Sequence, residues 1–276
     1  MDPNQYNHIE NFVEGMTNLS EKIRQFDPDH IIAPMIGAVP FIDVLCIIDD
    51  KFENEKVEYI PASNKIKSVK RVMRNWFKNF LDENYSLEPI KIVSIDEVIS
   101  GSSMLRVYKQ AQAAIQEKAS EEMMKPFLKY GSDEQIRSIL TGEVKQRMRE
   151  EQARLINYFP FGIVDEGLRR SKKIPFNKEY QKLIEERKTD SVSVECIPTM
   201  DRPEFFPVNY RRVSDGSTKH HFYPTISGFN VSESYIEFLQ TVAKIVGKNP
   251  EGITFNNMAK ILNSTRYLSP ELRGDY

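Results

Sequence analysis

One stretch constrains the fold of this 276-residue chain more than any other, and it runs from Ile92 to Met104. It begins with the apolar run Ile92-Val93-Ser94-Ile95, which is typical of a buried strand. Two carboxylates, Asp96 and Glu97, come next, and the turn Ser100-Gly101-Ser102-Ser103 then leads into a helix-like segment. The order of strand, acidic pair, hydroxylated turn and helix N-terminus predicts a ligand loop at the end of a strand.

The residue types in this stretch point to a phosphorylated sugar. Loop amides and the positive end of a helix bind phosphate, and serine hydroxyls add donors. Carboxylates accept hydrogen bonds from sugar hydroxyls or hold a hydrated magnesium ion. Asp96 and Glu97 are therefore candidate catalytic and metal-binding residues, with Mg²⁺ as the expected cofactor. A second interpretation stays open, in which a buried strand simply ends in an ordinary Ser/Gly turn.

Strand and helix patterns alternate before this stretch. Apolar residues at helical spacing predict a helix over residues 8–26, and the buried run at 41–48 predicts a second helix. Strands are expected at 31–35 and 57–61. This alternation predicts an α/β fold with a parallel sheet, in which the ligand loops lie at the carboxyl ends of the strands.

The chain after the stretch is richer in helix than such a sheet needs. Residues 105–157 are helical in composition, so we expect a helical insertion at about 117–157 that caps the site or binds a partner. Further strands are predicted at 158–165 and 191–198. We expect one α/β domain over residues 1–230 and a C-terminal helical appendage over 231–276.

The Ile92–Met104 stretch resembles the phosphoribosyl pyrophosphate (PRPP) signature of type I phosphoribosyltransferases. In that family a hydrophobic strand and two adjacent acids precede a Thr-Gly-x-Thr-like loop. The resemblance implies a phosphoribosyltransferase-like core and magnesium-dependent attack on ribose C1 by a nitrogenous base, with pyrophosphate leaving. It also implies that Asp96, and after it Glu97, contact the ribose hydroxyls. The 5′-phosphate would be held by Ser100, Gly101, Ser102 and Ser103.

Other segments take their expected roles from the same resemblance. The turn Ile36-Gly37-Ala38 would face the pyrophosphate, and Phe159 or Phe161 would stack on the base. A basic run contributes Lys65, Lys67, Lys70 and Arg71, one of which would close over the polyphosphate. Two other interpretations of the run stay open: a solvated helix face and a nucleic-acid contact.

The sequence departs from the family pattern at two positions. Ile95 stands where the first acid is expected, and Ile36 stands where a basic residue is common. These departures favour an alternative, in which the fold binds a nucleotide as a signal without turnover. A third hypothesis is an interaction component of a bacterial conflict or antiviral complex. It would bind a protein partner, or a second copy of itself, through the helical insertion or the C-terminal helices. The sequence leaves open whether the protein is an enzyme.

Charge, cysteine content and sequence motifs limit the other functional classes to which the protein could belong. The formal net charge of −2 indicates no preference for nucleic acid or an anionic membrane. Cys46 and Cys196 lack metal-ligand spacing and predict reduced thiols in an intracellular protein. The sequence has no signal-peptide pattern and no apolar run long enough to span a bilayer, so we expect a cytoplasmic protein. Dinucleotide and Walker-type glycine motifs do not occur.

Overall fold

A five-stranded parallel sheet forms the centre of the molecule. The computed structural model describes residues 3–86, 88–130, 142–199, 202–213 and 221–274. The strand order is β2-β1-β3-β4-β5, and each neighbouring pair is parallel. The strands are β1 (His30–Met35), β2 (Val57–Pro61), β3 (Ile90–Val98), β4 (Ile156–Asp165) and β5 (Asp190–Val194). The predicted α/β class with a parallel sheet is confirmed.

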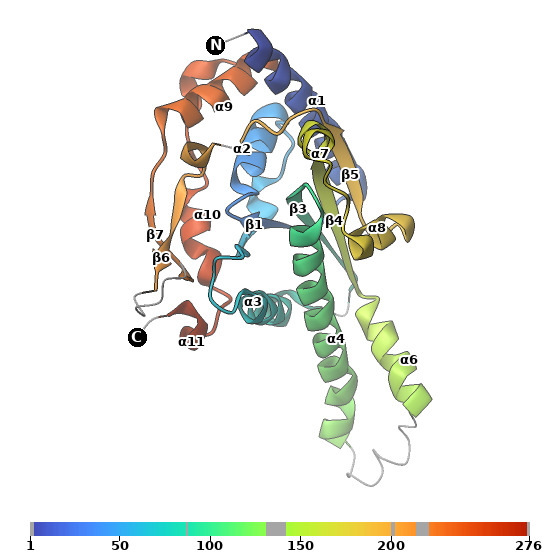
Figure 1. The fold of residues 1–276 in the computed structure, drawn as a ribbon. Helices are drawn as coiled ribbons and strands as arrows, with labels where there is room; N and C mark the ends of the chain where they lie inside the picture. The colour runs from blue at the N-terminus through green and yellow to red at the C-terminus, as the bar shows by residue number, and fades with distance from the viewer. Residues whose placement is uncertain (1–2, 87, 131–141, 200–201, 214–220, 275–276) are drawn as a thin grey trace.

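Helices cover both faces of the sheet (Figure 1). In chain order, the helices of the described residues are α1 (Pro3–Phe26), α2 (Val39–Ile48), α3 (Val69–Asn84), α4 (Ser102–Tyr130), α6 (Gly142–Ala153), α7 (Glu166–Lys172), α8 (Lys178–Glu185), α9 (Glu233–Ile245), α10 (Met258–Leu262) and α11 (Pro270–Arg273). Helices α1 and α2 pack on one face, and α3 and α4 on the other. Gly15 lets α1 approach β5 closely, because a β-carbon there would lie 2.3 Å from Cγ1 of Val194.

The sheet changes direction between β1 and β3. The chain passes from β1 outward to β2 and then crosses back to the other side of β1 to form β3. Pairing between β1 and β3 ends at Ile32 and Ser94, although the strands continue to Met35 and Val98. The two strands therefore part toward their carboxyl ends. In open α/β sheets, ligands bind at such a point.

The predicted helical insertion begins within α4. Figure 1 shows α4 and α6 side by side, extending away from the sheet as a hairpin. Residues 131–141 of the predicted insertion lie outside the described residues. Ion pairs join α4 to α3, including Lys78 with Glu121 at 2.9 Å and Lys118 with Asp82 at 2.7 Å. No residue of α6 is buried.

The C-terminal segment contributes to the same hydrophobic core as the sheet. Residues of α9 pack against α1 and α2, and Tyr267 contacts Trp76 with their ring centroids 4.9 Å apart. The indole nitrogen of Trp76 donates to the carbonyl oxygen of Ser264 at 2.8 Å. Between β5 and α9 along the chain comes an antiparallel pair of strands, β6 (Val208–Arg212) and β7 (Phe222–Phe229), which lies beside α10 (Figure 1). Within the described chain, none of the helices has the length and apolar character needed to cross a bilayer.

Candidate functional site

The two predicted ligand loops lie next to each other at the carboxyl edge of the sheet. The Gly37 loop (Ile36-Gly37-Ala38) follows β1, and the serine loop (Ser100-Gly101-Ser102-Ser103) joins β3 to α4. A β-carbon on Gly37 would lie 3.6 Å from Cδ of Glu97, and 3.7 and 3.8 Å from its two carboxylate oxygens. The Glu97 carboxylate therefore rests against the backbone of the Gly37 loop. We call these two loops, together with Glu97, the edge site.

Asp96 and Glu97 point to opposite faces of the sheet, as neighbouring strand residues do. Asp96 is only 4% exposed and lies beneath the start of α4, where Ser103 acts to lower its pKa. The amide of Glu97 donates to Oδ1 of Asp96 at 3.0 Å, while Oδ2 is buried without a partner among the described residues. Burial, helped by the charge of Glu97, raises the pKa of Asp96 to about 8. At neutral pH Asp96 is therefore mostly a protonated acid.

Glu97 is the carboxylate of the predicted pair that contacts the Gly37 loop. Burial and the nearby charge of Asp165 raise its pKa above the ordinary value for glutamate. Asp165 ends β4 and caps α7, accepting from the amide of Leu168 at 2.7 Å and from the amide of Ile197 at 2.9 Å. Because both oxygens of Asp165 already accept backbone hydrogen bonds, Glu97 is the better placed of the two for a ligand.

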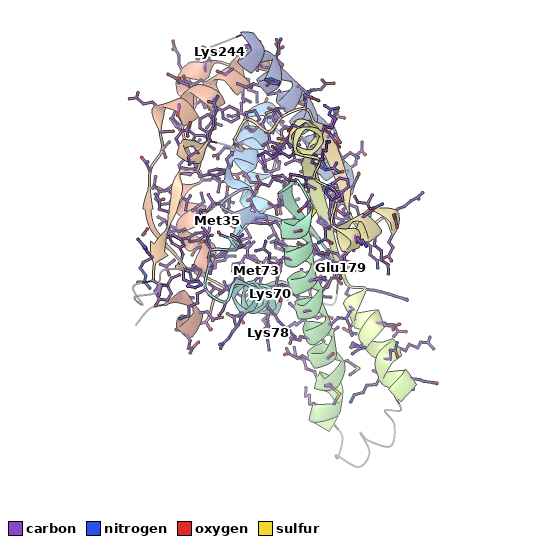
Figure 2. The ribbon with its side chains drawn as sticks, viewed as in Figure 1. Met35, Lys70, Met73, Lys78, Glu179 and Lys244 are labelled. Carbon is purple, nitrogen blue, oxygen red and sulfur yellow. The ribbon has the colours of Figure 1, made fainter. Side chains whose placement is uncertain are left out.

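The serine loop is held from behind by α8. Gly101 has a φ of 77°, and a β-carbon there would lie 2.2 Å from Cδ1 of Tyr180. The amide of Asn177 donates to the carbonyl oxygen of Ser100 at 2.8 Å. An ion pair at 2.6 Å joins Glu179 of α8, labelled in Figure 2, to Lys109 of α4. Helix α8 thus fixes the loop that the sequence predicts to bind phosphate.

Both loops carry backbone amides suited to an anion. The amides of Ile36, Gly37, Gly101 and Ser103 donate no hydrogen bond within the described part of the chain. The peptide bond between Met35 and Ile36 is cis. Unpaired amides at the first turn of a helix form an anion site. Ser102 is exposed at the start of α4, and its hydroxyl lies 3.1 Å from that of Ser100.

The basic run is partly tied to the β6–β7 pair. The amide of Lys67 donates to the carbonyl of Phe222 at 2.9 Å, and the amide of Phe222 donates to the carbonyl of Lys65 at 3.1 Å. Lys70 and Arg71 lie in the first turn of α3, where Figure 2 labels Lys70. All four basic side chains are exposed. The segment after β2 is therefore anchored by its backbone, while its cations extend into solvent.

Phe161 lies in the hydrophobic core, and the half-buried Phe159 packs against that core; neither lies at the edge site. Phe159 stacks on Phe26 of α1 with their ring centroids 5.4 Å apart, and Phe161 is only 3% exposed. Both lie before the carboxyl end of β4, which is at Asp165. The structure does not bring either ring to the Gly37 loop or the serine loop.

Three residues at the site were missed by the sequence analysis: Asp165, Asn177 and Tyr180. The N-cap position of Asp165, directly before a short helix, is a signal that could have identified it. Tyr180 and Asn177 carry no such signal for the serine loop, because the contact joins segments far apart in the sequence. Within the described residues, no group of three or more His, Cys, Asp or Glu side chains is arranged to hold a metal ion. No protein-family model, no curated protein and no solved structure matches the chain.

Proposed function

We propose that the edge site binds PRPP, or a nucleotide with the same phosphoribosyl group, together with magnesium. The observation that carries this proposal is the contact between Glu97 and Gly37, because it brings the end of β3, three residues before the serine loop, against the Gly37 loop. The position supports it as well, since the site lies where β1 and β3 part at their carboxyl ends.

The chemistry of each loop suits one part of such a ligand. The serine loop would hold the 5′-phosphate with its unpaired amides, its hydroxyls and the N-terminus of α4. The amides of Ile36 and Gly37 would face the pyrophosphate. Glu97 would accept hydrogen bonds from the ribose hydroxyls, because its carboxylate lies against the Gly37 loop at the end of the strand that leads into the serine loop.

Magnesium fits this site as an ion carried by the phosphates. Mg²⁺ keeps several waters and needs only one or two carboxylates when a substrate supplies phosphate oxygens. Glu97 meets that need, whereas Asp96 is buried and protonated and does not. When bound, the ion would neutralise charge on the departing pyrophosphate.

Two activities of this site are proposed. In the first, a nitrogenous base attacks ribose C1, its nitrogen forms the new bond, and the C1–O bond to pyrophosphate breaks. In the second, the site binds its ligand without turnover. Two features favour the second activity. Asp96 lies on the face of β3 opposite to Glu97, so Glu97 is the single carboxylate of the pair that faces the Gly37 loop. The Gly37 loop also carries the apolar Ile36.

The test is calorimetric titration of the full chain with PRPP and magnesium. We expect Glu97→Gln to weaken binding by about tenfold or more, because it removes a charged acceptor. The matched control is Asp96→Asn, which replaces a carboxyl that is already protonated and should leave affinity nearly unchanged. Equal effects of the two substitutions would reject the edge site. If PRPP binds at the edge site, release of pyrophosphate on adding a nitrogenous base would distinguish the transferase from a site that binds its ligand without turnover.

A further inference from the structure

A cavity of about 580 Å³ lies beside the edge site, at the carboxyl ends of β4 and β5. Its walls come from four parts of the chain: the start of α1, α7 with the residue before it, the segment that follows β5, and α9. Asp165 belongs to the wall of this cavity and also acts on the charge of Glu97. The cavity therefore adjoins the edge site, and its volume is in the range of small-molecule sites.

One wall of the cavity is aromatic. Phe205 and Phe238 line it, with their ring centroids 5.2 Å apart, and both side chains are almost fully buried. The guanidinium of Arg202 lies 5.0 Å from the centre of the Phe205 ring. Because these rings are largely covered by their neighbours, they give the cavity an apolar wall that suits the edge of a flat ring.

The charge on the lining is predominantly negative. Asp165, Glu195 and Glu237 contribute carboxylates, against the single guanidinium of Arg202. Glu195 is paired with Arg170, and both oxygens of Asp165 accept backbone amides. Glu237 is exposed on α9, and its carboxylate forms no ion pair within the described chain. The cavity therefore offers Glu237 to a positively charged or amino-bearing group and disfavours a phosphate.

We infer that this cavity binds a planar heterocyclic amine or amidine, with its ring against Phe205 and Phe238 and its N–H groups donating to Glu237. Binding of this class of ligand follows from the cavity alone. Identifying the ligand as the acceptor of a phosphoribosyl group rests on the proposed function.

Benzamidine and benzoate test the inference, because they share a flat ring and carry opposite charges. In calorimetric titrations of the full chain, we expect saturable binding of benzamidine and at least about tenfold weaker binding of benzoate. Glu237→Gln should weaken benzamidine binding by about fivefold. Glu233→Gln, one turn earlier on α9 and outside the cavity wall, should leave it unchanged.

Three results would overturn the inference: no saturable benzamidine binding, equal binding of the two probes, or equal effects of the two substitutions. The same protein titrated with PRPP and magnesium distinguishes the two proposals. Glu237→Gln should not alter PRPP affinity, because Glu237 lies outside the edge site. If PRPP does not bind but benzamidine does, the edge-site proposal fails and the cavity stands as an independent site.

Discussion

The ring of Tyr180 lies directly against the backbone of Gly101, so closely that a β-carbon would come within 2.2 Å of its Cδ1 atom. Tyr180 itself is fully buried and packs with Val98 and Met104. The φ of 77° at Gly101 adds a second requirement for glycine. The serine loop is therefore shaped by the packing of α8 as much as by its own residues.

Gly101→Ala should lower the free energy of unfolding by more than about 2 kcal/mol, through left-handed strain and a clash in a packed core. Gly247→Ala is the control, because Gly247 has a φ of 74° and open space around its β-position. It should cost only about 1 kcal/mol. Urea denaturation measures both values. Equal losses would mean that Tyr180 moves aside and does not hold the loop.

Gly37→Val should abolish PRPP binding without unfolding the protein. A single β-carbon is accommodated at 3.6 Å from Glu97, but the two added methyl groups would occupy the space beside its carboxylate. Calorimetry with PRPP and magnesium checks the affinity, and denaturation checks the fold. Gly228→Val of β7, where a β-carbon meets no atom within 4 Å, is the matched control. Unchanged affinity in a folded Gly37→Val protein would contradict the prediction.

Asp43 should make the stability of the protein fall as pH rises from about 4 to 7. Tyr235 donates to this buried carboxyl at 2.5 Å and Asn257 at 2.6 Å, yet burial raises its pKa to about 7. The unfolded chain releases this proton near pH 4, whereas the folded chain keeps it until about pH 7. The folded state binds more protons between these values, so each pH unit there costs up to about 1.4 kcal/mol.

Asp43→Asn should remove this part of the pH dependence, because asparagine does not titrate. The free energy of unfolding at pH 5, 6 and 7, from urea denaturation, gives the slope for each protein. Asp50→Asn is the control, since the Asp50 side chain is 86% exposed. An unchanged slope in Asp43→Asn would show that the folded protein holds this group ionised.

The sheet could be predicted from sequence because its strands are short, apolar and separated by helical patterns. The strand over 57–61 was predicted with the bounds it has, and β1 and β4 differ by one or two residues. The strand, loop and helix at Ile92–Met104 were also predicted in order. These features depend on local sequence, which explains why they could be predicted from it.

The orientation of the site residues depends on contacts that the sequence does not display. Alternation along β3 requires Asp96 and Glu97 to face opposite ways, but only the packing of α4 decides which one is covered. Phe159 of β4 packs against the core through its contact with Phe26 of α1. The cavity beside the edge site is assembled from α1, α7 and α9, and no single stretch of the chain predicts it.

The docking of the C-terminal segment has a consequence for synthesis on the ribosome. Trp76 is fully buried, and part of its cover comes from Tyr267 and the carbonyl of Ser264, which are translated long after α3. When the strands of the sheet have left the ribosome but residue 267 has not, the nascent chain would therefore expose the Trp76 side chain. Exposed apolar surface of this kind attracts chaperones and aggregates. The final core should close only after residue 267 has left the exit tunnel.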